Sequence, residues 1–279
     1  MHRLRDYESV AGEKIIRQIR EEASPLAGKH ITHLNSTYYG GGVAEILSGL
    51  IPIFNELGIS TGWRLLKGSP DFFSITKKFH NALQGDKINL TRIKKKIYED
   101  VNRANAEFTH LSHHDAVIVH DPQPLPMIMH YRKTQPWIWR CHIDLSRTNR
   151  ELWNYLGRFI KRYDKVVVSK NSFRKKSLAV PQEVIYPSIN PLSAKNQELS
   201  ESAISKYLKK FGIGREKPII SQVSRFDKWK DPAGVIRAFR QVKKEADCRL
   251  VLLGSMATDD PEGQRVYQQV VEMARGDDA

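Results

Sequence analysis

ITHLNSTYYGGGVAEILSGL, residues 31–50, decides the fold of this chain. It begins as an apolar strand over residues 31–34, passes through a polar turn and three glycines, and continues as a helix. Such a loop is how α/β proteins bind phosphate, because free backbone N–H groups and the helix dipole face the anion. The spacing is not G-x-G-x-x-G, so the dinucleotide fingerprint is absent. We predict phosphate or sugar binding at Gly40, Gly41 and Gly42; the alternative is a tight turn that needs a positive φ.

The composition is that of an ordinary globular protein. The 279 residues are 40% hydrophobic and 27% charged, which allows one large or two ordinary domains. No apolar run approaches the roughly 20 residues that cross a bilayer, and the acidic N-terminal stretch does not resemble a signal peptide, so we expect no membrane partner. Cys141 and Cys248 form no C-x-x-C pair, which argues against a disulfide framework and fits a reducing, cytoplasmic setting.

The net charge of +14 indicates an anionic partner, either nucleic acid or a nucleotide or sugar phosphate. The basic residues occur in short groups that alternate with apolar residues in expected helices, which favours solvated helix faces. No zinc finger, RNP1 or GXXG signature is present, so we do not expect nucleic acid as a partner.

Strands and helices alternate along the chain, which predicts βαβ units and a parallel sheet. We expect strands over residues 31–34, 63–66, 116–120, 137–142, 165–169, 183–186, 219–223 and 249–253. We expect a helical extension over residues 1–29, which Pro25 and Gly28 end. We expect helices over residues 43–57, 88–108, 150–163, 201–211 and 232–246, after Pro122 and from near residue 261 onward, with Thr148 as a cap. Residues 67–87 are expected to form a long polar connection.

Two prolines in residues 187–191 predict a hinge. Residues 1–190 are then a Rossmann-like domain and residues 191–279 the first part of a second one. Only two strands follow the hinge, so either they pack on the first domain or the second domain is truncated. An open edge on the strand at residues 249–253 would favour association, with a homodimer as one form of it.

Polar residues follow several expected strands, and ligands bind outside the carboxyl ends of parallel strands. These residues are Asn35, Asp121, those from Arg140 to Asp144, Tyr186 and those from Arg225 to Lys230.

Seven segments, in order, resemble the retaining nucleotide-sugar glycosyltransferases of GT-B architecture, and among them the glycosyl-transferring trehalose synthases. They are HLNSTYYGGGVAEIL (33–47), KFHNALQG (78–85), VHDPQP (119–124), WIWRCHIDLS (137–146), PSINPLSAKN (187–196), SQVSRFDKWKDP (221–232) and TDDPEG (258–263).

The resemblance implies that the glycine loop faces the donor diphosphate. It also implies that Arg225 and Lys230 bind the diphosphate and stabilise the departing nucleotide, since fixed cations favour a leaving group that gains negative charge. The alternative is a surface ion pair of either cation with Asp227 or Asp231.

On the acceptor side, the resemblance implies that His142 reaches the transferred sugar and that Asp144 holds acceptor hydroxyls. Asp121, Arg140 and Asn35 would line the same edge. The alternatives are a core histidine at position 142 and an ion pair between Arg140 and Asp144.

The implied reaction is glucose transfer from NDP-glucose to glucose with retention, giving trehalose. It needs no cofactor and no metal. We reject a metal site at His110, His113 and His114, which lack partnering carboxylates.

The family continues beyond the helix near Met273 with further strands and a paired-Glu motif, so we expect this chain to be truncated and its catalytic equipment incomplete. A trehalose phosphorylase and a non-catalytic basic binding protein remain as alternatives.

Overall fold

The computed structural model describes residues 2–39, 41–254 and 262–277. These residues divide into two compact units, Met1–Leu192 and Ser193–Ala279. The division predicted from the sequence lies at residue 190, within the hinge. Each unit is described by itself.

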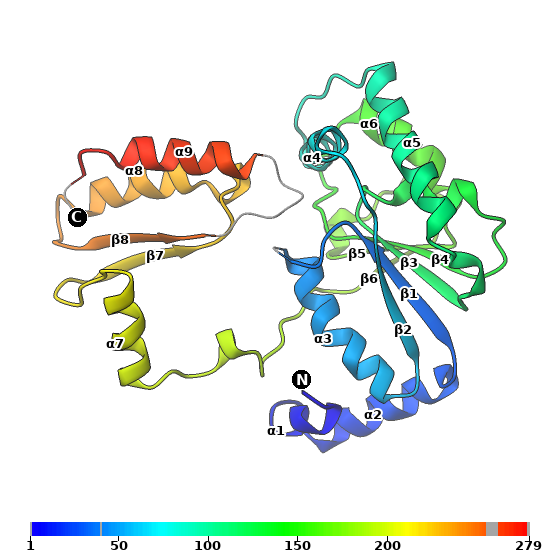
Figure 1. The fold of residues 1–279 in the computed structure, drawn as a ribbon, viewed down its shortest axis with the longest axis horizontal. Coiled ribbons are helices and arrows are strands. Elements are labelled where there is room, and N and C mark those ends of the chain that lie inside the picture. Colours follow the sequence, from blue (N-terminus) through cyan, green and yellow to red (C-terminus); the bar gives the residue numbers. More distant parts are fainter. Residues whose placement is uncertain (1, 40, 255–261, 278–279) are drawn as a thin grey trace. The chain divides into compact units, whose positions relative to one another are not determined.

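The first unit is built on a parallel sheet of six strands in the order β2-β1-β3-β4-β5-β6 (Figure 1). This is the Rossmann-like architecture that alternating strands and helices predict. The strands are β1 (His30–Asn35), β2 (Ser60–Leu65), β3 (Ala116–His120), β4 (Trp137–Cys141), β5 (Lys165–Val168) and β6 (Gln182–Val184).

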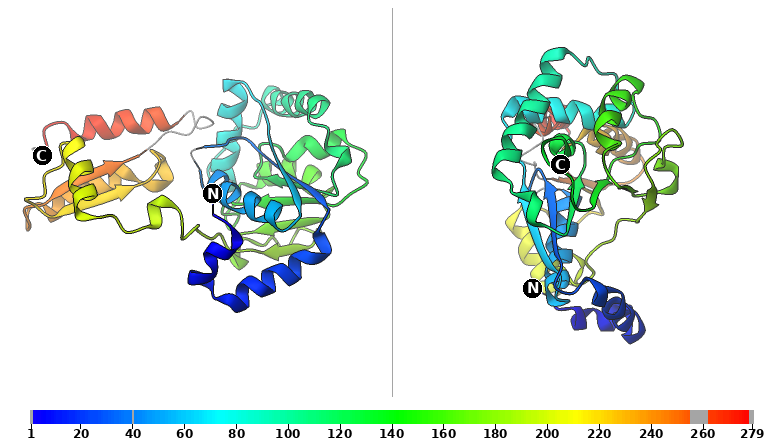
Figure 2. Two further views of the ribbon diagram at one scale, coloured as in Figure 1. Left: turned by 60° about the horizontal axis from the view of Figure 1, so that its bottom comes forward. Right: turned by 90° about the vertical axis from the view of Figure 1, so that its right-hand side faces the viewer.

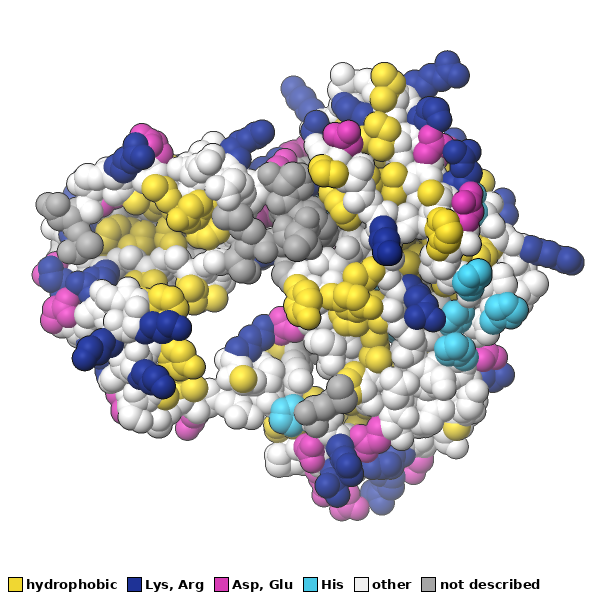
Figure 3. Space-filling model, in the orientation of Figure 1, with side chains coloured by type: hydrophobic (Ala, Val, Ile, Leu, Met, Phe, Trp, Pro, Cys, Tyr) yellow, Lys and Arg dark blue, Asp and Glu magenta, His cyan; other side chains and the backbone are white. Residues whose placement is uncertain are grey.

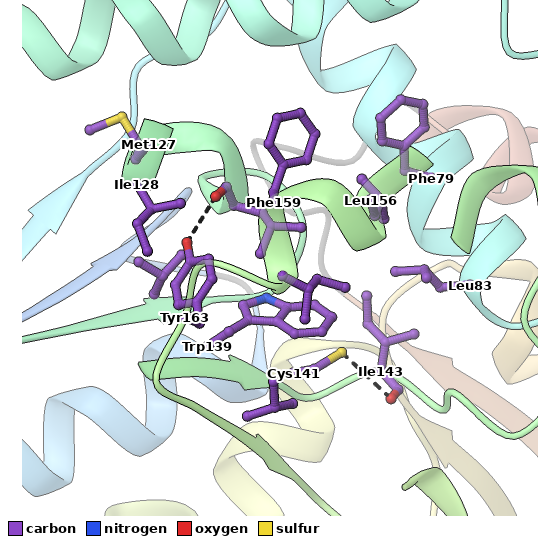
Figure 4. Packing of buried hydrophobic residues seen from close by; sticks show 14 of the residues in the cluster. Phe79, Leu83, Met127, Ile128, Trp139, Cys141, Ile143, Leu156, Phe159 and Tyr163 are labelled. Atoms are coloured by element: carbon purple, nitrogen blue, oxygen red, sulfur yellow. Dashed lines mark hydrogen bonds between the residues drawn. The ribbon is translucent and has the colours of Figure 1, made fainter. Parts of the chain in front are cut away.

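One face of this sheet carries the main hydrophobic core. Buried side chains of α4 (Pro70–Leu83), α5 (Arg92–Phe108), α6 (Arg150–Ile160) and the 3-10 helix η4 (Leu125–His130) pack against alternate residues of the central strands. Figure 4 shows this packing around Trp139, with Phe79, Phe159 and Tyr163 nearby. The Tyr163 hydroxyl donates to the Leu125 carbonyl at 2.8 Å, so a buried polar group in this core is satisfied.

Helix α3 (Gly42–Glu56) belongs to the other side of the sheet. Its buried residues, Ala44 and Leu47, lie outside the main core cluster. The N-terminal extension is a chain of short helices near α3: η1 (Leu4–Tyr7), α1 (Glu8–Ala11), α2 (Glu13–Ala23) and η2 (Ser24–Leu26) (Figure 2). The sequence predicts a helical extension over residues 1–29, and within it Gly12, with a φ of 82°, divides α1 from α2.

The prediction of a long polar connection after β2 is wrong. Residues 70–83 form α4, whose N-cap Ser69 accepts a hydrogen bond from the Phe72 N–H at 3.2 Å. Phe72, Ile75 and Phe79 recur at helical spacing and are buried, whereas the polar residues between them obscured this pattern in the sequence.

Smaller differences concern helix ends. Asn149, not Thr148, caps α6, because its side chain accepts from two N–H groups of the first turn. Helix α5 begins at Arg92 after the cap Thr91, and the expected helix after Pro122 is the 3-10 helix η4. Three further 3-10 turns are η3 (Leu111–His113), η5 (Asn171–Phe173) and η6 (Ala194–Asn196).

The second unit has a parallel pair of strands, β7 (Ile219–Val223) and β8 (Arg249–Leu253), with α7 (Glu201–Lys210), η7 (Lys228–Lys230), α8 (Pro232–Val242) and α9 (Gly263–Ala274). The segment TDDPEG, except for its last two residues, and the expected start of the last helix at Pro261 lie outside the described residues. Val223 is 74% exposed and Leu253 is 56% exposed, so this small sheet leaves apolar surface uncovered.

Candidate functional site

The N-terminus of α3 follows the carboxyl end of β1. Gly41 is the N-cap, and none of the described side chains caps the helix. The first intrahelical bond of this turn runs from the Glu45 N–H to the Gly41 carbonyl at 3.1 Å, so the N–H groups of residues 42–44 have no helical acceptor. Gly40, the first glycine of the loop, lies outside the described residues.

Open space lies beside Gly41 and Gly42. Gly41 has an extended φ of −165°, and neither glycine has a positive φ. A Cβ added to either residue would meet no atom of the described residues within 4 Å. The tight-turn alternative therefore does not explain these two glycines, and the backbone is open to the close approach of a ligand.

Asn35 is the last residue of β1, and its side-chain amide is hydrogen-bonded to other residues of the protein. Its Oδ1 accepts from the Trp63 indole N–H at 2.6 Å, and its Nδ2 donates to the Thr37 carbonyl at 2.9 Å. The Tyr38 ring packs edge-on against Trp63 with 4.6 Å between the ring centroids. These contacts hold the segment between β1 and α3 close to the sheet edge.

Asp121 follows β3 in a left-handed conformation, with a φ of 59° that few non-glycine residues adopt. Its carboxylate accepts from the His142 backbone N–H at 2.7 Å. Its own N–H donates to the Arg140 carbonyl at 2.9 Å, and its carbonyl accepts from the Trp139 indole at 2.9 Å. These bonds fix an otherwise costly backbone geometry at the edge of the sheet.

His142 is the end of a chain of three imidazoles. His33 Nδ1 lies 2.9 Å from His120 Nε2, and His120 Nδ1 lies 2.9 Å from His142 Nε2. Of these three histidines, only His142 is predicted from the sequence as a site residue; His33 and His120 are not. In the sequence, all three lie at or near the carboxyl ends of expected strands, but only the structure shows that these strands are adjacent.

Burial keeps these histidines neutral. It lowers the pKa of His33 to about 4 and, together with the positive charge of Arg140, lowers the pKa of His142 to about 3. Burial also lowers the pKa of His120 well below its usual range, and its neighbours His33, His142 and Arg140 act in the same direction. His142 is therefore a hydrogen-bonding group, not a cation, at neutral pH.

The guanidinium of Arg140 is bound to backbone carbonyls. It donates to Val168 at 3.0 Å and to Ile185 at 2.6 Å, and only 8% of the residue is exposed. It thus joins β4 to the carboxyl ends of β5 and β6, in place of the ion pair with Asp144 that was the alternative. The Asp144 carboxylate accepts from the Ser146 N–H at 2.7 Å and remains half-buried at the edge.

Arg225 and Lys230 lie beyond the carboxyl end of β7 in the second unit. Arg225 is 3.9 Å from the buried carboxylate of Asp227, a loose ion pair. Lys230 is exposed and makes no ion pair with any described residue; Asp231 instead caps α8 by accepting from Gly234 at 2.9 Å.

The surface histidines of the first unit are visible as a group in Figure 3. The ring centroids of His30 and the buried His114 lie 4.4 Å apart, with the rings tilted by 37° to each other. Across residues 2–39, 41–254 and 262–277, no cluster of His, Cys, Asp or Glu side chains could hold a metal ion. Within the same residues, no helix is long and apolar enough to cross a membrane.

The fold defines the class of this chain. A solved structure of α,α-trehalose 6-phosphate synthase from Burkholderia multivorans matches 89% of this chain and 68% of that chain, with a TM-score of 0.65 and 17% sequence identity. The chain therefore has the α/β fold of GT-B glycosyltransferases, with a six-stranded parallel sheet in its first unit.

Sequence comparison identifies the family. The family model described as the N-terminal domain of trehalose synthase matches residues 33–175. A trehalose synthase from Thermococcus litoralis is 46% identical over 272 residues, which cover 96% of this chain and 66% of that protein. A trehalose phosphorylase from Grifola frondosa is 27% identical and covers 96% of this chain and 43% of its own length. The chain belongs to the trehalose synthase family, and it spans about two thirds of the length of the trehalose synthase that it matches.

Proposed function

We propose that this chain is part of an enzyme that transfers glucose from NDP-glucose to glucose, with retention, to give α,α-trehalose and NDP. The observation that carries the proposal is the 46% identity to a trehalose synthase along 96% of the chain. The polar residues at the carboxyl edge of the first sheet support it, because this is where parallel α/β sheets bind ligands.

Each unit carries one candidate anion-binding element for the donor. In the first unit, the N–H groups of residues 42–44 have no helical acceptor, and the described atoms leave open space beside Gly41 and Gly42 for a phosphate. In the second unit, Arg225 and Lys230 supply positive charge, and Lys230 forms no ion pair with a described carboxylate. Fixed positive charge would stabilise the leaving diphosphate without a metal ion.

The acceptor glucose would lie against Asp121, Asp144 and His142. The two carboxylates accept hydrogen bonds from sugar hydroxyls, and the neutral imidazole of His142 offers one ring nitrogen. Asn35 and Arg140, whose side chains are fixed by hydrogen bonds to other residues, would form part of the wall of this site. The leaving phosphate would take the proton of the attacking hydroxyl on the same face of the sugar, so no protein nucleophile is required.

A trehalose phosphorylase is the second candidate, because the Grifola frondosa protein also matches 96% of this chain. The two functions differ in the group that leaves the donor, NDP or inorganic phosphate. The test uses a protein that carries residues 1–279 and extends to its relatives' length. We expect trehalose from glucose and NDP-glucose, and no glucose 1-phosphate from trehalose and phosphate; the reverse result would identify a phosphorylase.

A further inference from the structure

The three imidazoles lie on one face of the sheet, along a diagonal that leads to its carboxyl edge. The register of β1 and β3 places His33 level with Ile118, two residues before His120. The register of β3 and β4 places His120 level with Arg140, two residues before His142. Side chains two residues apart on a strand share a face, so each strand moves the imidazole one step further along the same face.

The number of ring protons allows only two tautomeric states of the three linked imidazoles. A neutral imidazole has one N–H and one lone pair. His120 contacts a ring nitrogen on both sides, at 2.9 Å each, so it must donate to one neighbour and accept from the other. The three protons therefore lie either all on Nδ1 or all on Nε2.

The buried end of the histidine series, at His33, favours the state with the protons on Nδ1. His33 is 3% exposed, and its Nε2 has no hydrogen-bond partner among the described residues. With the protons on Nε2, this atom would be a buried N–H without an acceptor, which is the rarer defect in protein interiors. With the protons on Nδ1, it is only an unused lone pair.

The exposed end of the histidine series is compatible with the same state. His142 is half-buried, and its Nδ1 is not among the buried polar atoms that lack a hydrogen-bond partner. A proton on Nδ1 therefore leaves no buried N–H without an acceptor at this end.

We propose that His33 and His120 are positioning residues that fix the proton of His142 on Nδ1, so that His142 always presents an N–H donor to the site. The ligand group that suits this donor is an oxygen lone pair, and a sugar hydroxyl that accepts from His142 must donate its own proton elsewhere. This last step rests on the proposed function; the proton position does not.

The direct test is ¹⁵N NMR of the 279-residue chain with ring-labelled histidine. Two-bond ¹H–¹⁵N correlations distinguish the two tautomers, and single substitutions assign the signals of the 10 histidines. We expect His33, His120 and His142 to carry the proton on Nδ1 throughout the range from pH 5.5 to pH 8. A proton on Nε2 of any of them, or an even mixture, would overturn the proposal.

Variants at His33 test the coupling. His33→Met replaces a donor with the weak acceptor of a thioether, so His120 and then His142 should shift toward the Nε2–H form. His33→Asn keeps a donor and should keep His142 on Nδ1–H. If His142 is unchanged in a folded His33→Met, the coupling does not exist; if that variant does not fold, the wild-type spectrum decides.

These spectra need no substrate, so they separate this inference from the proposed function. Nδ1–H histidines in a protein that makes no trehalose would leave the inference standing and remove the function. Trehalose synthesis by a protein whose three histidines carry the proton on Nε2 would overturn only the inference about the tautomer.

Discussion

His33→Met should make the first unit less sensitive to acid. Burial lowers the pKa of His33 to about 4 in the folded protein, whereas an unfolded histidine has a pKa of about 6.5. Between these values the unfolded chain binds a proton that the folded protein does not. The stability that neutral His33 contributes is therefore complete above pH 6.5 and is lost as the pH falls through this window.

The magnitude follows from the two pKa values. One proton of difference gives a slope of about 1.4 kcal/mol per pH unit, and between pH 7 and pH 5 the loss from His33 alone is about 2 kcal/mol. The variant should lose about 2 kcal/mol less than the wild type over this range, because it has no imidazole to protonate at this position.

The assay is urea unfolding, followed by tryptophan fluorescence at pH 7, 6 and 5. Trp63, Trp137, Trp139 and Trp153 report on the first unit. The control is His113→Met, which removes an exposed histidine and should leave the slope as in the wild type. Parallel profiles for the wild type and His33→Met, within about 0.5 kcal/mol, would refute the reasoning.

Three further predictions concern the donor site and the second unit. In a protein of the relatives' length, Lys230→Ala should lower kcat about 100-fold, roughly 3 kcal/mol of transition-state stabilisation, with a smaller change in KM; a kcat within a factor of about two would place the charge away from the leaving group. Gly41→Val should raise the Kd for NDP in calorimetry without changing Tm, because its side chain enters open space; unchanged NDP affinity would exclude close approach there. Leu253→Lys on the exposed strand β8 should reduce self-association in sedimentation experiments, and a wild-type chain that is monomeric at all concentrations would contradict this.

The parallel sheet could be predicted because its strands are short apolar runs between helical patterns. Strand β3 and strand β7 have the expected bounds. Helix α4 could not be predicted in the same way, since its apolar positions are separated by polar residues such as Lys77 and Asn81, both of which are buried. Tertiary packing overrides the local pattern there.

The candidate site was predicted at the level of strand ends, and its hydrogen-bond network was not. Asp121 and His142 could be placed at an edge from the sequence, but the bond between them depends on a left-handed backbone at Asp121. The chain of histidines depends on the strand order and register, which bring together residues 87 and 22 positions apart. Neither property is encoded in a local pattern.

The most direct measurement of the proposed function is a ¹³C NMR time course with unlabelled NDP-glucose and glucose labelled at C1. The protein used contains residues 1–279 and is as long as the trehalose synthases that it matches. We expect α,α-trehalose in which one of the two anomeric carbons is labelled, formed together with NDP. No trehalose, or a product with a β-linked glucose, would contradict it.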